Sequence, residues 1–189
     1  MPDHCLAALA QMARDLPGVV DALFAGQTVA LWLADGTDHE LVQTRLQSLW
    51  QGAQLTQEPP RCLTLPIHYD GEDLHEVAQR CGLSPREVIA LHCGVNYRVA
   101  WLGFLPGFAY LDGLPEPLQL PRRSTPRVSV PAGSLAIAGS QSALYPCESP
   151  GGWHLIGRCN LTLFDPRAEP PSLLLPGDRI RFEPVGVPE

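Results

Sequence analysis

The chain has 189 residues, of which 45% are apolar and 17% are charged, a composition that supports one or two folded domains and excludes a disordered chain. All 13 basic residues are arginine, so the chain has no lysine for a Walker-type phosphate loop, a Schiff base or a biotin anchor. The net charge of −7 lies in residues 1–94, with five arginines against twelve acidic residues, whereas residues 95–189 hold eight of each. Because nucleic-acid phosphates repel an acidic chain, we expect no nucleic-acid partner.

The first third of the chain predicts two helices and a β-hairpin. Apolar residues recur at helical spacing near the start, and two β-like runs precede a second amphipathic stretch. In chain order we expect a helix over 5–16, a hairpin over 19–33, a helix capped by Thr37 or Asp38, and a polar linker over 51–60.

A strand and a pair of short helices are predicted next. Apolar and polar residues alternate over 63–67, where Pro66 favours a position at the edge of a sheet. The two helices are expected over 73–81 and 85–93. The second has an N-cap, a proline at its first position and a capping-box glutamate, at Ser84, Pro85 and Glu87. The acidic charge favours a packing role for this pair over a DNA-reading helix-turn-helix.

Beyond residue 97 glycine or proline interrupts nearly every apolar run, a pattern typical of a closed or nearly closed β-barrel. No segment reaches the ~18–20 apolar residues that span a bilayer, and the N-terminus has no export signal. The six cysteines form no C-x-x-C pair, and the histidines lack metal-ligand spacing. We therefore expect a cytoplasmic protein with reduced thiols, no membrane contact and no metal.

Two segments of the second half could carry chemistry. Residues 103–110 alternate aromatic rings with glycine and proline, which suits either the wall of a ligand pocket or a packed barrel corner. Arg122, Arg123 and Arg127 lie on one proline-containing loop, where guanidinium groups could clamp an anionic substrate or pair with the acidic first half.

Two further features leave similar alternatives. Gly151 and Gly152 precede Trp153, and paired glycines either expose backbone N–H groups to an oxyanion or form an ordinary turn. His92 stands at the end of a predicted helix, where it either carries a proton or stabilises the last carbonyls of the helix.

These segments together resemble a known family. Residues 103–110 match its signature G-F-x-P-G-F-x-Y-L, and the match continues in order through 122–134, 136–146, 149–158, 163–166 and 176–178. The chain is similar, from about residue 66 onward, to the smaller subunit of bacterial ATP-dependent 5-oxoprolinase. This family is also labelled allophanate hydrolase subunit 1, contains a carboxyltransferase subdomain and includes Kip-type inhibitors of histidine kinases.

The resemblance implies an α+β fold, with a small N-terminal α/β lobe over 1–94 followed by a cyclophilin-like β-barrel domain over 95–189. Family members begin with two strands before the first helix, so we expect the first strands of the lobe to be missing here. The resemblance also implies a hetero-oligomer with a larger partner subunit, with the reaction site between the two subunits.

In that family the complex uses ATP, and no covalent cofactor, to convert 5-oxo-L-proline to L-glutamate with a third, lactam-opening component. We expect ATP to be bound mainly by the partner, and this chain to be an amide (lactam) hydrolase subunit that is inactive alone. Arg122, Arg123, Arg127 and Arg158 are expected to bind anionic groups, Gln141 to recognise an amide, and His92 to act as acid or base. The expected pocket residues are Phe104, Phe108, Tyr110, Tyr145, Gly151, Gly152 and Trp153.

Two alternatives remain open. A Kip-type protein would bind a sensor histidine kinase and block phosphotransfer without catalysis. A component of a urea or allophanate pathway would act as a carboxyltransferase or hydrolase, with carrier-bound biotin on another chain because this one has no lysine.

Overall fold

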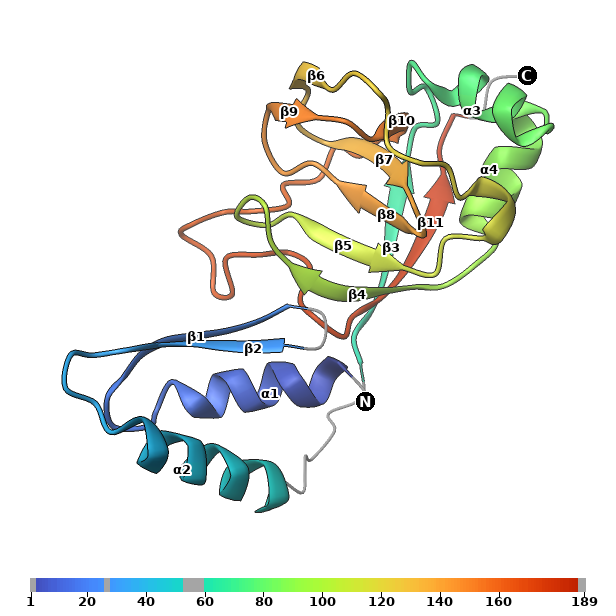
Figure 1. Cartoon of the computed structure of the whole chain (residues 1–189). Coiled ribbons are helices and arrows are strands. Elements are labelled where there is room, and N and C mark those ends of the chain that lie inside the picture. The colour runs from blue at the N-terminus through green and yellow to red at the C-terminus, as the bar shows by residue number, and fades with distance from the viewer. Residues whose placement is uncertain (1–2, 26–27, 53–59, 187–189) are drawn as a thin grey trace. The chain divides into compact units, whose positions relative to one another are not determined.

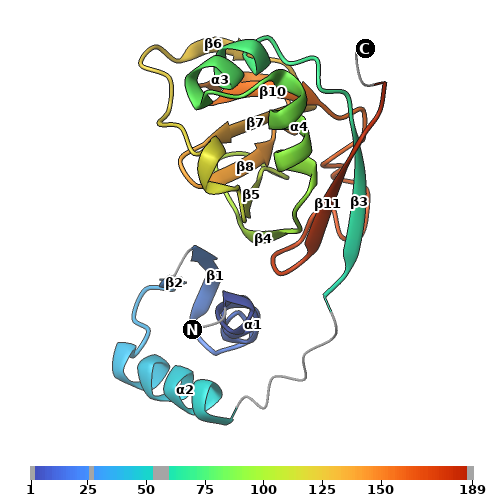
Figure 2. The ribbon, with the colours of Figure 1, turned by 90° about the vertical axis from the view of Figure 1, so that its right-hand side faces the viewer.

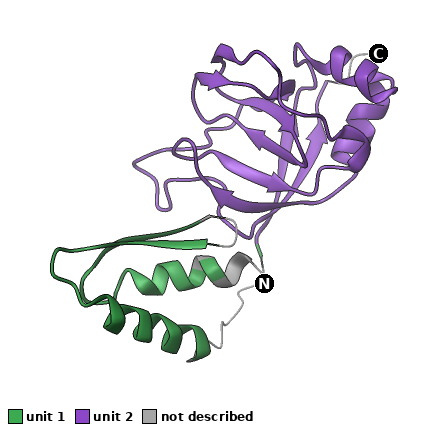
Figure 3. Cartoon of the chain, viewed as in Figure 1, with its two compact units in different colours: residues 1–60 green, residues 61–189 purple. Residues whose placement is uncertain are grey.

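The chain divides into two compact units, residues 1–60 and 61–189 (Figure 3). The computed structural model describes residues 3–25, 28–52 and 60–186. The linker expected over 51–60 falls mostly outside the described residues.

The first unit contains two helices and an antiparallel hairpin, as the sequence predicts (Figure 1). The carboxylate of Asp38 caps the second helix, because it accepts the backbone N–H groups of Glu40 and Leu41 at 3.0 and 3.1 Å. Ala10, Ala13 and Ala22 form its small core. The elements are α1 (Asp3–Ala13), β1 (Val19–Ala25), β2 (Thr28–Leu33) and α2 (His39–Gly52).

The second unit is built on a seven-stranded mixed sheet with the order β10-β7-β8-β5-β4-β11-β3. Its strands are β3 (Cys62–Ile67), β4 (Tyr97–Leu102), β5 (Ala109–Asp112), β7 (Ser134–Ala138), β8 (Gln141–Leu144), β10 (His154–Arg158) and β11 (Arg179–Pro184). Neighbouring strands are antiparallel except β3 and β11, which are parallel and lie side by side in Figure 2. Pro66 lies in β3, the last strand of this order, as predicted.

One backbone pair brings the two ends of the sheet together. His68, just past β3, and Arg158, at the end of β10, exchange hydrogen bonds of 2.9 and 2.8 Å between their N–H and C=O groups. β10 and β3 are the first and last strands of the sheet order. This bridge therefore nearly closes the sheet into the barrel predicted from the sequence.

Small residues on the outer face of the barrel allow a second layer to pack there. Ala136, Ala138 and Ala143 point away from the barrel interior and belong to a separate apolar cluster with Val130 and Trp153. A two-stranded antiparallel ribbon is formed by β6 (Arg127–Val130) and β9 (Ser149–Gly151). Val130 lies in β6 and Trp153 follows β9, and both pack in the cluster with these alanines. The ribbon positions the loop that holds the predicted arginines.

Helices α3 (Leu74–Cys81) and α4 (Pro85–Cys93) and the short 3-10 helix η1 (Glu116–Leu118) belong to the same unit. The capping box of α4 is complete: the Ser84 hydroxyl accepts the N–H of Glu87, and the Glu87 carboxylate accepts the N–H of Ser84. Buried residues of both helices join the barrel core. The boundary expected after residue 94 therefore falls within the second compact unit, because β3, α3 and α4 bury their apolar faces against the barrel.

None of the helices within the described ranges is both long and apolar enough to cross a membrane.

Candidate functional site

A buried carboxylate organises two of the predicted arginines. Asp73, only 3% exposed, accepts hydrogen bonds from Arg123 Nη1 at 2.9 Å and from Arg127 Nη2 at 2.7 Å through one carboxylate oxygen. Its other carboxylate oxygen accepts the backbone N–H of Leu155 at 2.7 Å. Arg123 and Arg127 therefore form ion pairs with the acidic first half of the chain, which is one of the two alternatives that the sequence allows.

The loop between β3 and α3 holds Asp73 against β10. The Asp73 N–H donates to the carbonyl of Leu155 at 2.9 Å. A Cβ atom at Gly71 would lie 2.4 Å from the backbone of residues 155–157, so only glycine allows this close approach. The position of the carboxylate is therefore fixed by backbone contacts.

The charge of Arg127 is firmly maintained. Burial opposes the charged form, but hydrogen bonds and Coulomb attraction from Asp73 and Glu72 outweigh it, so the pKa of Arg127 is raised. Arg127 Nη1 and Arg123 Nε are buried and have no hydrogen-bond partner within the described chain. We call Asp73, Arg123 and Arg127 the Asp73 cluster. Two of its guanidinium nitrogens, Arg123 Nε and Arg127 Nη1, thus donate no hydrogen bond within it.

Arg122 is placed differently from its neighbours. Its side chain is exposed, and its guanidinium carbon lies 5.9 Å from the centre of the Trp153 ring. No carboxylate pairs with it among the residues that the structure describes. A cation–π interaction with an indole orients a guanidinium while leaving its N–H groups able to bind an anion.

The predicted aromatic residues do gather into one group. The rings of Tyr110, Tyr145 and Trp153 surround Phe108, with ring centres 4.9, 5.2 and 6.1 Å from it. Phe108, Tyr145 and Trp153 are buried, whereas Tyr110 is partly exposed. Most of this group is therefore a packed barrel corner, and only its edge reaches the surface.

Phe104 forms that exposed edge. Its ring is 60% exposed, packs edge-on against Phe108 at 5.3 Å, and its backbone has a φ of 68°, a left-handed conformation that is unfavourable for phenylalanine. An exposed ring held by a strained backbone is typical of a functional surface. Phe108 links this ring to Trp153, over which Arg122 lies. We call the exposed Phe104 and Arg122, with the buried Trp153 beneath Arg122, the aromatic–arginine face.

The paired glycines serve packing. A Cβ atom at Gly151 would lie 2.3 Å from the Tyr145 hydroxyl, and the carbonyl of Gly152 accepts the N–H of Arg123 at 2.8 Å. The Gly151 position lets Tyr145 pack closely under the ribbon, and the Gly152 hydrogen bond holds the arginine loop beside it.

Three other predicted residues have partners of their own outside the Asp73 cluster. Gln141 donates to Asp112 at 2.9 Å, and Arg158 donates to Asp70 at 2.8 Å in an exposed pair. His92 is fully buried in the barrel core, where its ring stacks on Phe182 with centres 4.8 Å apart.

The environment of His92 favours the neutral ring. The Ser142 hydroxyl donates to the carbonyl of Ala136 at 3.2 Å, so it accepts from His92 Nε2 at 3.1 Å, and His92 Nδ1 accepts from the Tyr69 hydroxyl at 2.9 Å. This tautomer follows from the hydrogen-bond network. Burial lowers the pKa of His92 to about 3. In this structure His92 is a core residue, and it has no exposed surface from which to exchange a proton with a substrate.

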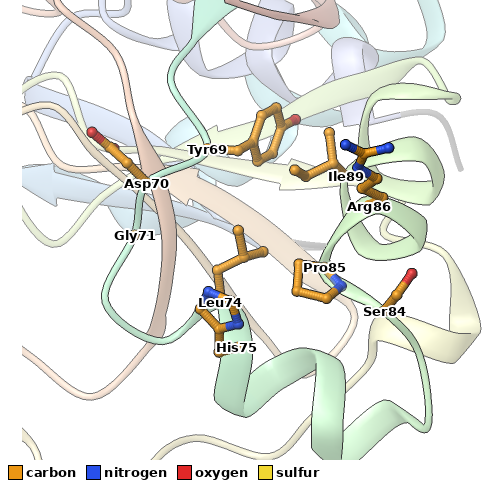
Figure 4. A pocket seen from close by; sticks show the side chains of 9 residues that line it. All are labelled: Tyr69, Asp70, Gly71, Leu74, His75, Ser84, Pro85, Arg86 and Ile89. Atoms are coloured by element: carbon orange, nitrogen blue, oxygen red, sulfur yellow. The ribbon is translucent and has the colours of Figure 1, made fainter. Parts of the chain in front are cut away.

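Sequence reasoning missed two features. The pattern around Asp73 indicates only ordinary first-turn helix charge, because its burial depends on β10, more than 80 positions away. A cavity of about 430 Å³ between the β3–α3 loop and the start of α4 has no sequence signal (Figure 4). No group of three metal-ligating side chains occurs within the described residues.

Comparison with known proteins assigns the chain to a family. Residues 3–174 match the family model described as carboxyltransferase domain, subdomain C and D, and the chain belongs to this family. A protein of Escherichia coli O157:H7 that is named as a 5-oxoprolinase subunit is 44% identical over 180 residues, which are 93% of this chain and 83% of that protein.

Solved structures agree on the fold. A crystal structure of the protein TTHA0988 is similar with a TM-score of 0.83 and 44% identity, covering 98% of this chain but only 37% of that longer chain. The urea amidolyase of K. lactis is similar with a TM-score of 0.70 over 97% of this chain and 13% of that chain. Its 17% identity carries the likeness of fold alone.

Proposed function

We propose that this chain is a subunit of a 5-oxoprolinase. The similarity to an Escherichia coli protein named as a subunit of that enzyme, over 83% of its length, supports this proposal. The name of that relative also supports a complex with other subunits, here a larger partner and a third, lactam-opening component.

The proposed reaction is ATP-dependent opening of a lactam. ATP, 5-oxo-L-proline and two waters give L-glutamate, ADP and phosphate, and the C–N bond of the ring is the bond that breaks. The absence of lysine is compatible with this reaction, since arginines here and residues of the partner can contact the phosphates.

The contribution of this chain is the aromatic–arginine face. The observation that carries this assignment is the placement of Arg122, an exposed guanidinium over Trp153 with no carboxylate partner in the described part of the chain. Arg122 lies between Pro121 and Arg123, and Arg123 is anchored by its ion pair with Asp73. An anchored loop with one open cation can bind an anionic group of a substrate or of ATP at a boundary between subunits, without any reorganisation of the loop.

Reconstitution tests the proposal. The chain, its larger partner and the third component are mixed with ATP, and ADP is measured with and without 5-oxo-L-proline. We expect ADP release that requires both 5-oxo-L-proline and this chain, with glutamate formed in equal amount. An ADP rate that is the same without this chain, with all proteins folded, would contradict the proposal.

A further inference from the structure

The cavity in Figure 4 shares no lining residue with the aromatic–arginine face and has the walls of a small-molecule site. Residues 69–71 and 74–75 form one side of it, and residues 84–86 and 89 form the other. Its volume, about 430 Å³, falls within the range of roughly 300–1,000 Å³ that small-molecule pockets occupy.

The floor of the cavity is apolar and fixed. Tyr69, Leu74 and Ile89 are 3, 4 and 6% exposed and belong to the barrel core, and Pro85 stands beside them (Figure 4). The Tyr69 hydroxyl is bound to His92 at 2.9 Å inside the core, so the phenol is held in place by a buried hydrogen bond. A rigid apolar floor favours a ligand with an apolar ring or branched chain.

The rim of the cavity carries a permanent cation, Arg86. Arg86 and His75 are exposed, and neither has a carboxylate partner among residues 60–186. Asp70, the acidic residue of the lining, is paired with Arg158 at 2.8 Å, and its side chain points away from the other lining side chains in Figure 4. The Ser84 hydroxyl is already bonded to Glu87. The rim therefore offers a cation to a ligand and no unpaired anion.

We propose that this cavity binds a small organic monoanion of amino-acid size, whose apolar body lies on Tyr69, Leu74 and Ile89 and whose carboxylate pairs with Arg86. The site is additional to the proposed subunit function and does not depend on it. A guanidinium at the mouth of an apolar hollow selects for charge at one end of the ligand and against charge at the other.

Cyclopentanecarboxylate is a suitable probe, with cyclopentanecarboxamide as its neutral match. Binding is followed by NMR titration of the full chain, with amide shifts assigned to residues 70–75, 84 and 86–89. We expect the carboxylate to shift these amides and the carboxamide to bind at least about tenfold more weakly, as the loss of one charge-assisted contact predicts.

Arg86→Gln should weaken carboxylate binding by about tenfold, whereas Arg167→Gln, a matched change at an exposed arginine outside the cavity, should leave it unchanged. Ile89→Phe, which fills the cavity from its floor, should abolish binding while the far-UV spectrum of the chain is retained. Absence of shifts in these two segments at saturating probe, or equal binding of carboxylate and carboxamide, would overturn the proposal.

Discussion

Asp73 and Leu155 exchange two hydrogen bonds, from the N–H of Asp73 to the carbonyl of Leu155 at 2.9 Å and from the N–H of Leu155 to the Asp73 carboxylate at 2.7 Å. This exchange fixes the start of α3 on β10. It also places a buried anion where Arg123 and Arg127 converge. The arginine loop is therefore anchored by the same residue that joins helix to barrel.

Removing the charge of Asp73 should destabilise the fold. Asp73→Asn removes the buried carboxylate that Arg123 and Arg127 share and leaves them only the exposed carboxylates of Glu76 and Glu72. Breaking one side of such a buried network costs about 3 kcal/mol. Urea unfolding measures the change in the free energy of unfolding. The matched control is Asp70→Asn, whose exposed pair with Arg158 is worth at most about 1 kcal/mol. Equal losses in the two variants would show that the Asp73 cluster does not anchor the loop.

His92 should make stability depend on pH. Its pKa is about 3 in the folded chain against 6.5 when unfolded, so the unfolded state binds more protons between these values. The stabilisation is therefore complete above pH 6.5 and is lost as pH falls toward 3, at up to about 1.4 kcal/mol per pH unit.

The variant His92→Gln separates this effect from the titration of carboxylates. We expect it to be less stable than wild type at pH 7, with a difference that shrinks as pH is lowered, in unfolding curves recorded from pH 7 to 4. His75→Gln, at an exposed histidine, should follow the wild-type pH dependence. A constant difference between wild type and His92→Gln would mean that His92 does not titrate on unfolding in this range.

Gly71→Ala should separate the β3–α3 loop from β10. The added methyl group meets backbone atoms of residues 155–157 at 2.4 Å, and backbone cannot move aside as a side chain can. We expect a loss of about 1–3 kcal/mol, measured by thermal unfolding. Gly82→Ala is a useful comparison, because there the new methyl group meets no atom within 4 Å and only the φ of 69° opposes it. A smaller loss at residue 71 than at residue 82 would contradict this account.

Two substitutions at Phe104 should separate backbone strain from the function of the ring. Phe104→Gly relieves the strain of the positive φ, so its free energy of unfolding should stay within about 1 kcal/mol of wild type. Phe104→Ala keeps the strain and should be the less stable of the two. Because both lose the exposed ring, both should reduce ADP release in the reconstituted complex to a similar extent. Full activity in either variant would exclude a role for the ring.

Local signals in the sequence predicted the elements well, because their causes lie within a few residues. The Ser84–Glu87 capping box, the Asp38 cap and the 19–33 hairpin are of this kind, and all three are confirmed. The barrel followed from regular punctuation by glycine and proline. The His68–Arg158 bridge that nearly closes it joins residues 90 positions apart and has no local signature.

The candidate site was predicted only in part, for the same reason. The aromatic segment and the three arginines do lie around one ribbon. The residues that pair with them are distant in the sequence, so the local sequence could not predict these pairs. Arg127 forms an ion pair with Asp73, which is 54 positions away, and His92 is held in the core by hydrogen bonds with Tyr69 and Ser142. Contacts between residues distant in the sequence therefore determine which titratable side chains remain exposed to bind a substrate.

The rate of 5-oxo-L-proline-dependent ADP release by the reconstituted complex, compared between wild type and Arg122→Ala, tests the central claim most directly. Arg122 is exposed and lies 5.9 Å from the centre of the Trp153 ring, so the variant should keep its melting temperature, and its rate should fall by about tenfold or more. Arg167→Ala, at another exposed arginine, should retain the wild-type rate. Equal rates for Arg122→Ala and wild type would contradict the assignment of function to the aromatic–arginine face.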